Sequence, residues 1–193
     1  GVVLCLNGHS ISNTFKDYSR PNDEKATIQI NSGKFTLTDC SRDENGQNKG
    51  SVTHAKESRG TGVTFFNTDT KFDMYGGNIR GNYAVDHHPR WNGAGVYVSS
   101  SRCRFTMYGG SISDNRGHGV SVVEGATFTM NGGSITNNTM PGSSGAGVVN
   151  CGTVVMNKGL ISKNSITGGD GGGAGVHNGP AVINAKYQKP VFE

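Results

Sequence analysis

A twelve-residue line recurs four times along this chain and limits the architectures that it can adopt. The copies are KFDMYGGNIRGN at 71–82, RFTMYGGSISDN at 104–115, TFTMNGGSITNN at 127–138 and TVVMNKGLISKN at 153–164. They begin 33, 23 and 26 residues apart. Repeats of roughly 20–50 residues are typical of solenoids, propellers and similar arrays. The four copies should therefore be equivalent units that stack on one another.

Each copy reads as two short strands joined at a glycine corner. Residues two apart point to the same side of a strand, so F-x-M buries one face, and S-I-S forms a second strand after the turn. The corner glycines are Gly76, Gly109 and Gly132, with Lys158 in the fourth copy. A third strand, of the type GAGV, is expected at 93–98, 117–122, 145–150 and 173–178. Each repeat is thus roughly one coil of a parallel β-helix.

Stacked coils would bury each apolar position against its equivalents in the next coil, at the ~4.8 Å spacing of neighbouring strands. A slip of one residue would turn inward side chains outward, so differences in repeat length must be absorbed in loops. The expected apolar ladders are Phe72, Phe105, Phe128 and Val154; Met74, Met107, Met130 and Met156; Ile79, Ile112, Ile135 and Ile161; and Val96, Val120, Val148 and Val176.

An asparagine stands three residues after each isoleucine of the repeat. Stacked amides can satisfy one another's hydrogen bonds, so we predict an internal asparagine ladder with a structural role. Its members are Asn82, Asn115, Asn138 and Asn164.

Residues 4–70 follow the same plan less regularly. In LCLNGHSI, Leu4, Leu6, Gly8 and Ile11 are assigned to the Phe, Met, Gly and Ile positions. Further strands are expected to carry Ile28 and Ile30, then Phe35 and Leu37, with Val63 on the first strand of the next coil. AVINA at 181–185 is expected to begin another coil. We treat 1–193 as a single domain, with less regular coils at 4–70, regular coils at 71–184 and a tail at 185–193.

The lines LCLNGHSI, FTLTDCS, FTMNGGSITNN and GAGV resemble right-handed parallel β-helix regions of large bacterial surface and secreted proteins. These belong to the pectate-lyase-like superfamily, whose members include adhesins as well as enzymes. The resemblance runs from Leu4 to about Asn184. It implies an all-β fold, a right-handed parallel β-helix of about six coils with three short strands each, and an extracellular or cell-surface location. The scaffold hosts both enzymes and inert stalks, so it does not fix the function.

The composition argues against two classes of partner, nucleic acids and membranes. Glycine makes up 31 of the 193 residues, more than twice the usual share of ~7%, which suits many tight turns. The formal net charge is +4, and no run of Lys or Arg resembles a nucleic-acid or membrane footprint. No apolar stretch approaches the ~20 residues that span a bilayer. We therefore expect neither nucleic-acid binding nor membrane insertion.

Four cysteines occur, Cys5, Cys40, Cys103 and Cys151, and no two of them form a C-x-x-C pair. They could make two disulfides, but their places in the repeat do not obviously match. Free cysteine behaves as a small hydrophobic residue, so we expect buried free thiols.

The catalytic candidates are Asp69 and His118. The triplets NTD at 67–69 and GHG at 117–119 resemble two signatures of polygalacturonases, which hydrolyse glycosidic bonds with carboxylates. However, the paired aspartates and the Arg-Ile-Lys motif of that family are missing, and GHG stands where other coils have GAG. We therefore favour a chance match and read His118, like His177, as an outward polar residue of the valine strand.

The loop GNYAVDHHPRWNGAG at 81–95 is the main candidate for recognition. Aromatic rings with polar neighbours suit carbohydrate or protein ligands, because the ring supplies apolar area and the polar groups supply direction. The candidate ligand-binding residues are Tyr83, Asp86, His87, His88, Arg90 and Trp91. Packing of Trp91 over the flank of the coil, and metal binding by the histidine pair, are the alternatives.

Two polar loops are read as structural. The segment DCSRDENG at 39–46 has oxygen-bearing side chains at alternating positions, as a calcium-binding loop does. However, Glu44 occupies the position where such a loop needs glycine for its tight turn, and the bidentate Glu at the end of such a loop is missing. We expect a solvated turn there, and a plain spacer in the glycine-rich stretch 167–175. We predict no metal and no cofactor.

The leading functional hypothesis is a non-catalytic extracellular module. It would be a rigid stalk or an adhesin-like domain that presents loops to a glycan or to a host or cell-surface protein. One alternative is a polysaccharide-active hydrolase or lyase. Another is a subunit that stacks end to end into a fibre, because unpaired strand edges are templates for further pairing.

Overall fold

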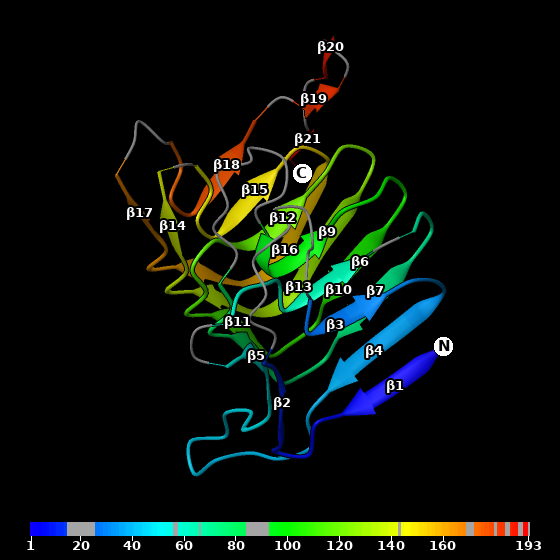
Figure 1. Ribbon diagram of the computed structural model, residues 1–193, viewed down its shortest axis with the longest axis vertical. Coiled ribbons are helices and arrows are strands. Elements are labelled where there is room, and N and C mark those ends of the chain that lie inside the picture. Colours follow the sequence, from blue (N-terminus) through cyan, green and yellow to red (C-terminus); the bar gives the residue numbers. More distant parts are fainter. Residues whose placement is uncertain are drawn as a thin grey trace.

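The computed structural model describes residues 1–14, 26–55, 58–65, 67–83, 93–142, 144–168, 172–179, 181–183, 186–188 and 191–192. Every regular element in these ranges is a strand (Figure 1). Strand pairing is parallel throughout them except in one short hairpin. The all-β prediction and the expectation of parallel stacking are confirmed. None of the described residues forms a helix of the length and apolarity needed to cross a bilayer.

Three rows of strands build a solenoid-like stack. The first row contains β1 (Val2–Cys5), β4 (Lys34–Thr38), β7 (Lys71–Met74), β10 (Arg104–Met107) and the first halves of β13 (Thr127–Thr136) and β16 (Thr153–Ser162). The second row contains β2 (Ser10–Asn13), β5 (Ser51–His54), β8 (Asn78–Arg80), β11 (Ser111–Ser113) and the second halves of β13 and β16. The third row contains β3 (Ile28–Ile30), β6 (Val63–Phe65), β9 (Gly93–Val98), β12 (His118–Val122), β15 (Val148–Asn150) and β18 (Val176–Asn178).

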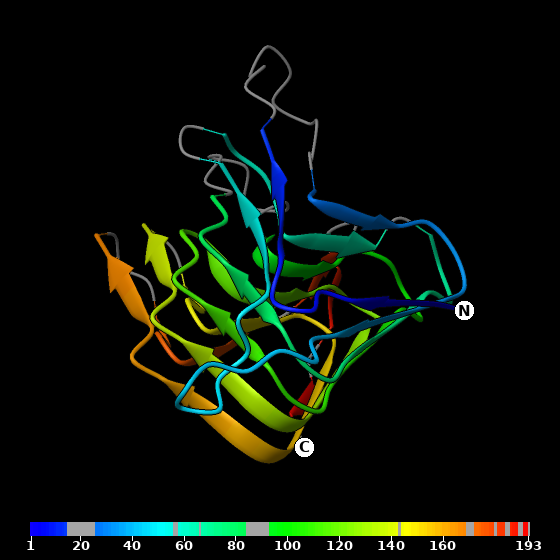
Figure 2. The ribbon, with the colours of Figure 1, turned by 90° about the horizontal axis from the view of Figure 1, so that it is seen from below.

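The first two rows are one continuous sheet. Strands β13 and β16 run through the glycine corner without a break, although the sequence predicts two separate strands in each copy. Figure 2 shows the sheets curled into a half-barrel around the interior. We use the word coil for one passage of the chain through the three rows.

The apolar ladders lie in the predicted register. Phe72 pairs with Phe105, and Phe105 with Phe128, so that successive rings stack with centroids 4.9 Å apart. The methionine, isoleucine and valine ladders pair in the same way. Most members are fully buried, and each large side chain contributes roughly 1.5–3 kcal/mol through burial. The ladders are therefore the main stabilising element of the fold.

The asparagine ladder is also confirmed. The Nδ2 of Asn115 donates to Oδ1 of Asn138 at 2.8 Å and to the carbonyl oxygen of Ile79 at 3.1 Å. Its Oδ1 accepts from the side chain and the backbone amide of Asn82, at 2.9 and 3.0 Å. His54 extends the ladder by one coil, because its Nδ1 lies 2.8 Å from Oδ1 of Asn82. Stacked amides thus satisfy one another inside the corner.

Close packing of the backbone explains the second glycine of GAGV. A Cβ at Gly95 would lie 2.2 Å from the carbonyl oxygen of Gly119, and one at Gly147 would lie 2.3 Å from that of Gly175. Backbone atoms cannot yield as a flexible side chain can. The repeated glycine therefore belongs to the stack and not to a catalytic signature.

The assignment of the first coil was wrong by two residues. Leu4 pairs with Leu37, which pairs with Met74, so Leu4 takes the methionine position and not the phenylalanine position. Ile11 does take the isoleucine position, opposite Val52. The corner of this coil is longer by two residues, and the extra space is filled by Leu6, which is buried against Gly50 and Gly77.

The C-terminal expectation was also wrong. Strand β19 (Ala181–Ile183) does not begin another coil, because it pairs antiparallel with β20 (Lys186–Gln188). Strand β21 (Val191–Phe192) instead adds to the first row, and its Phe192 lies opposite Val154. Phe192 thus adds a further member to the ladder of Phe72, Phe105, Phe128 and Val154, although it lies in the segment 185–193 that the sequence predicts to be a tail.

Only part of the cysteine prediction holds. Cys103 is buried and Cys151 is partly buried, but Cys5 and Cys40 are exposed. Both exposed thiols lie just after or at the end of first-row strands, Cys5 on β1 and Cys40 after β4.

We expect Asn115→Ala to lower the free energy of unfolding by roughly 2–4 kcal/mol, because it leaves buried polar groups of Asn82, Asn138 and Ile79 without their partner. Chemical denaturation would measure the loss. Asn157→Ala is the matched control, since Asn157 is exposed and its side-chain amide donates to the partly exposed Asn131. Its expected cost is within about 0.5 kcal/mol. Equal losses for the two variants would contradict the structural role of the ladder.

Candidate functional site

A row of outward side chains precedes the asparagine ladder. Asp114, Asn137 and Lys163 all have a φ of 56°, and Gly81 has a φ of 64°. This left-handed conformation suits Gly, Asn and Asp and is strained for most other residues. It reverses the direction of the side chains, so the next residue, an asparagine, points inward. The corner therefore displays a carboxylate, an amide and an ammonium group on successive coils.

A second outward row lies two residues further along each coil. Single parallel bridges join Tyr83 to Arg116 and Arg116 to Thr139, and β14 (Thr139–Pro141) pairs with β17 (Ser165–Thr167) so that Thr139 lies opposite Ser165. The row thus carries an aromatic ring, a guanidinium group and two hydroxyls. Its register is set by the ladder beside it.

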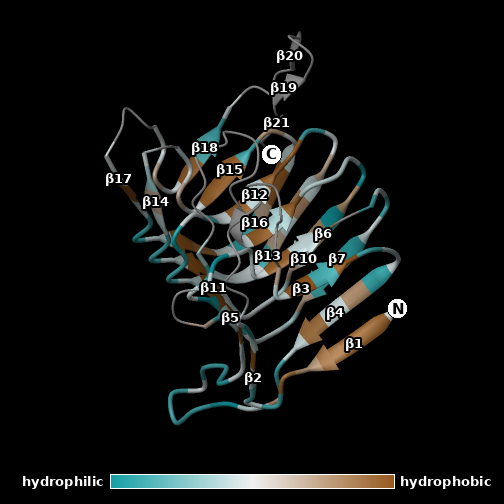
Figure 3. Ribbon diagram, in the orientation of Figure 1, coloured by the Kyte–Doolittle hydropathy of each residue, from teal (hydrophilic) through white to brown (hydrophobic). Residues whose placement is uncertain are grey.

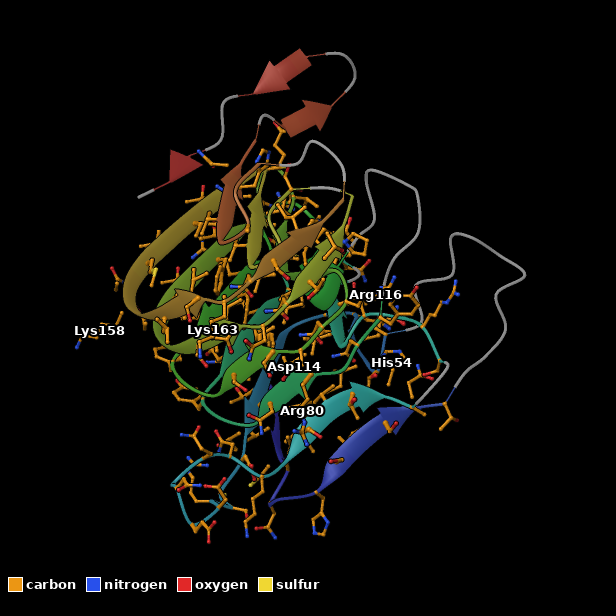
Figure 4. All side chains as sticks on the ribbon, turned by 90° about the vertical axis from the view of Figure 1, so that its left-hand side faces the viewer. His54, Arg80, Asp114, Arg116, Lys158 and Lys163 are labelled. Carbon is orange, nitrogen blue, oxygen red and sulfur yellow. The ribbon has the colours of Figure 1, made fainter. Side chains whose placement is uncertain are left out.

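An open cavity of about 410 Å³ lies where the two rows meet. Its lining consists of Asp114, Asn115, Arg116, Asn137, Thr139 and Thr167. Figure 4 looks at this side of the molecule and labels Asp114 and Arg116. All six lining residues are polar, and Asp114, Arg116, Asn137 and Thr167 are exposed.

Two contacts hold the charged groups of the cavity. The hydroxyl of Ser113 donates to Oδ2 of Asp114 at 2.7 Å. The guanidinium carbon of Arg116 lies 5.1 Å from the centroid of the Tyr83 ring, and that of Arg59 lies at the same distance. Such cation–π contacts orient a guanidinium group while its donors stay available. The arrangement offers donors and acceptors side by side to a polar ligand.

Tyr83 connects the cavity to the loop that the sequence singles out. The structure places it next to Arg116, with its ring in contact with two guanidinium groups. Asp86, His87, His88, Arg90 and Trp91 lie outside the described residues. The prediction that this loop binds a ligand is therefore carried forward as a hypothesis.

Asp114, Arg116, Asn137 and Thr139 are not among the site residues predicted from the sequence. A signal was present: the residue before each ladder asparagine changes from Gly to Asp, Asn and Lys between copies, while the asparagine itself and the isoleucine three residues before it stay the same. Positions that vary inside a repeat are free of the packing constraint and face outward.

The two catalytic candidates have different environments. Asp69 lies in the turn between β6 and β7, where its side chain is 66% exposed and pairs with Arg102 at 2.9 Å. The expectation of an outward His118 was wrong, because this residue is buried at the start of β12. Its Nδ1–H donates to the carbonyl oxygen of Gly145 at 2.8 Å. His118 thus occupies a packed position, equivalent in the repeat to Ala94 and Ala146.

Burial shapes the chemistry of His118. Removal from water lowers its pKa from 6.5 to about 4, and the Gly145 hydrogen bond opposes this only in part, while His177 nearby lowers the pKa further. The ring is therefore neutral at physiological pH. A neutral, buried histidine of this kind fits the interior of the stack.

In the acidic loop at 39–46, the carboxylate of Asp39 binds backbone amides of nearby segments of the chain. Asp39 is buried, and its oxygens accept from the amides of Gly8, Ser41 and Gly50 at 2.8, 3.2 and 2.7 Å. Burial alone would raise the pKa of Asp39, but these hydrogen bonds outweigh it and lower the pKa below its usual value. The prediction of a solvated turn is therefore wrong for Asp39, which is buried and hydrogen-bonded to the backbone. Among the described residues, no three His, Cys, Asp or Glu side chains are grouped so that they could hold a metal ion.

A second exposed feature lies on the outer face of the first row. The rings of Tyr75 and Tyr108 stack with centroids 4.5 Å apart and planes inclined by 7°, and both side chains are more than 40% exposed. Lys34 and Asp73 form an ion pair of 2.6 Å on the same face. This tyrosine pair is a separate surface that a binding experiment must distinguish from the cavity.

Comparison of the chain with protein-family models, with curated proteins and with solved structures gives no significant match. The function must therefore be inferred from the chemistry of these surfaces.

We expect stability to fall as the pH drops from about 6.5 toward 4, because the unfolded chain binds a proton on His118 that the folded state excludes. The loss attributable to this residue should reach roughly 3 kcal/mol near pH 4 and then level off. His118→Ala, which copies the residue of the neighbouring coils, should remove this part of the pH dependence. Denaturation curves at several pH values would measure it.

His9→Ala is the matched control, because His9 is exposed. This variant should keep the pH dependence of the parent chain. If His118→Ala and the parent lose stability in parallel between pH 6.5 and 4, the buried, neutral state assigned to His118 is wrong.

Proposed function

We propose that this chain is a non-catalytic, adhesin-like module of an extracellular bacterial surface protein and that it binds a glycan at the corner cavity. As the family resemblance implies, the stack would be a right-handed parallel β-helix of about six coils with three short strands each. The observation that carries the binding proposal is the display of Asp114, Arg116, Asn137 and Thr139 around one open cavity, whose lining residues all carry polar groups on their side chains.

A glycan suits this cavity because sugar hydroxyls both donate and accept hydrogen bonds. The carboxylate of Asp114 accepts, the guanidinium of Arg116 donates, and the amide of Asn137 does both. Successive coils repeat the display at the ~4.8 Å strand spacing. A linear saccharide laid across the coils would therefore meet a new set of polar groups at each step.

A protein partner is the alternative ligand, and the lining of the cavity argues against it. None of the six lining residues is aromatic or aliphatic. Protein interfaces depend on buried anchors, which are enriched in Trp, Tyr and Arg and packed in dry pockets. The cavity offers one such residue, Arg116, in an open and polar setting.

We expect Arg116→Ala to weaken glycan binding by roughly 10-fold or more, because a hydrogen bond to a charged group contributes about 1.5–3 kcal/mol. A library of neutral and anionic polysaccharides and oligosaccharides, immobilised on an array, would first identify a ligand. Isothermal titration with that ligand would then give the affinities of the parent chain and the variants.

Arg102→Ala is the matched control, since it removes the same charge from an exposed arginine in the turn that holds Asp69. Asp114→Asn removes the carboxylate without backbone strain, because Asn137 adopts the same φ on the next coil. Trp91→Ala tests the predicted loop. Equal weakening by Arg102→Ala, or loss of binding with Tyr108→Ala alone, would contradict the proposed site. Release of shortened saccharides would favour the enzymatic alternative.

A second candidate function is end-to-end self-association, which apolar residues at both ends of the stack favour. Val2 and Val3 on β1 are 62% and 70% exposed, and Met156 and Leu160 on β16 are 37% and 54% exposed. Figure 3 shows β1 as apolar along its length. Among the described strands, β1 pairs only with β4. Such an edge is a template for pairing with another chain.

Sedimentation velocity tests this candidate. We expect the apparent mass to rise above 20.3 kDa with concentration, and Val2→Lys to prevent the rise. Val2 lies opposite Phe35 in the inward ladder, so stacking would bury the introduced charge. Val3→Lys is the control, because Val3 faces outward and a charge there would stay in water. A constant monomer mass would contradict self-association.

A further inference from the structure

Two exposed cysteines on neighbouring coils lie unusually close together. The Sγ atoms of Cys5 and Cys40 are 2.7 Å apart, although the residues are 35 positions apart in the sequence. A disulfide bond is ~2.05 Å long, so the two sulfur atoms need to approach by only roughly 0.7 Å to bond. Both side chains are open to solvent and thus to an oxidant.

The backbone holds the two thiols in this position. Cys5 lies opposite Thr38 in the pairing of β1 with β4, and the amide of Leu6 donates to the carbonyl oxygen of Thr38 at 2.9 Å. Asp39, the residue before Cys40, is fixed by three backbone amides from the same corner. The pair therefore results from two anchored segments and not from a chance approach of flexible loops.

The pKa values of the two thiols also favour oxidation. The hydrogen bond from Cys40 lowers the pKa of Cys5, whereas the same contact raises the pKa of Cys40. A thiolate is the nucleophile in thiol–disulfide exchange, so Cys5 is the thiol that attacks first.

The other two cysteines are poorly placed for this chemistry. Cys103 is fully buried, and its thiol donates to the carbonyl oxygen of Asn67 at 3.0 Å. Burial raises the pKa of both Cys103 and Cys151. Both thiols should therefore stay protonated and react slowly.

We propose that Cys5 and Cys40 form a disulfide that fastens the first coil to the second. In the reaction, the Cys5 thiolate attacks a low-molecular-weight disulfide such as oxidised glutathione and releases one thiolate. The Cys40 thiolate then attacks the Cys5 sulfur of the mixed disulfide and releases the second. Two cysteine thiols are oxidised to one disulfide, one glutathione disulfide is reduced to two glutathione thiols, and the two protons lost by the cysteines are taken up by the two released glutathione thiolates.

The cross-link has a mechanical role at this position. Strand β1 is hydrogen-bonded along one side only among the described strands, and its Val2 and Val3 are exposed. A strand that is hydrogen-bonded along one side only frays more readily than one that is paired on both sides. A disulfide from the last residue of β1 to the next coil would restrain that fraying. The bond would persist in an oxidising compartment and be lost in a reducing one.

Peptide mapping tests the proposal directly. The folded chain is incubated with oxidised and reduced glutathione, it is then unfolded in denaturant so that N-ethylmaleimide blocks every free thiol, and after removal of the denaturant trypsin is added without reductant. Cleavage after Lys16, Lys34 and Arg42 puts Cys5 in peptide 1–16 and Cys40 in peptide 35–42. We expect these two peptides to be joined, whereas Cys103 and Cys151 carry the blocking group.

Thermal unfolding of the oxidised and reduced chain tests the mechanical role. Oxidation should raise the Tm by roughly 4–16 °C, and the Cys5→Ser/Cys40→Ser variant should show no such difference. In Cys40→Ser, Cys5 should accumulate as the mixed disulfide with glutathione. Blocked Cys5 and Cys40 in the oxidised parent chain, or links from either to Cys103 or Cys151, would overturn the proposal. Joined peptides with an unchanged Tm would overturn the fastening role.

Discussion

In-register parallel stacking is the constraint on which the rest of this structure depends. One coil cannot bury its own inward side chains, so Phe72, Phe105 and Phe128 stabilise the fold only because each ring lies on the next. The same stacking forbids a one-residue slip, since a slip would turn every ladder residue outward. Glycine at Gly95 and Gly147 follows from the same constraint, because neighbouring backbones leave no room for a Cβ.

The asparagine ladder divides each corner into an inner and an outer part. Inside, the side-chain amide of Asn115 is satisfied within the stack, so a change of this residue would leave buried polar groups without a partner. Outside, the preceding residue keeps the left-handed backbone conformation but is free in its chemistry, as Asp114, Asn137 and Lys163 show. The outer position can therefore change its side chain without changing the fold. The proposed binding site lies on this variable part.

Residues with chemically reactive side chains serve the scaffold in several places. His118 is buried and neutral, Asp39 anchors three backbone amides, and His54 caps the asparagine ladder. Each would be a plausible site residue if only its type were considered. Their partners instead place them in the packing and hydrogen bonding of the stack. The charged groups at the corner cavity, Asp114 and Arg116, instead remain exposed on the outside of the stack.

The sequence by itself determined the repeat, the parallel rows of strands, the apolar ladders and the asparagine ladder, because strand periodicity and repeat alignment fix which side chains point inward. It did not determine the register of the first coil, where the corner holding Leu6 is longer, or the pairing of Phe192 with the first row. It also could not foresee the burial of His118, the meeting of Cys5 with Cys40, or the cavity between Asp114 and Thr167. These features join residues of different coils. Only the tertiary structure decides them, because loop lengths set how one coil lies over the next.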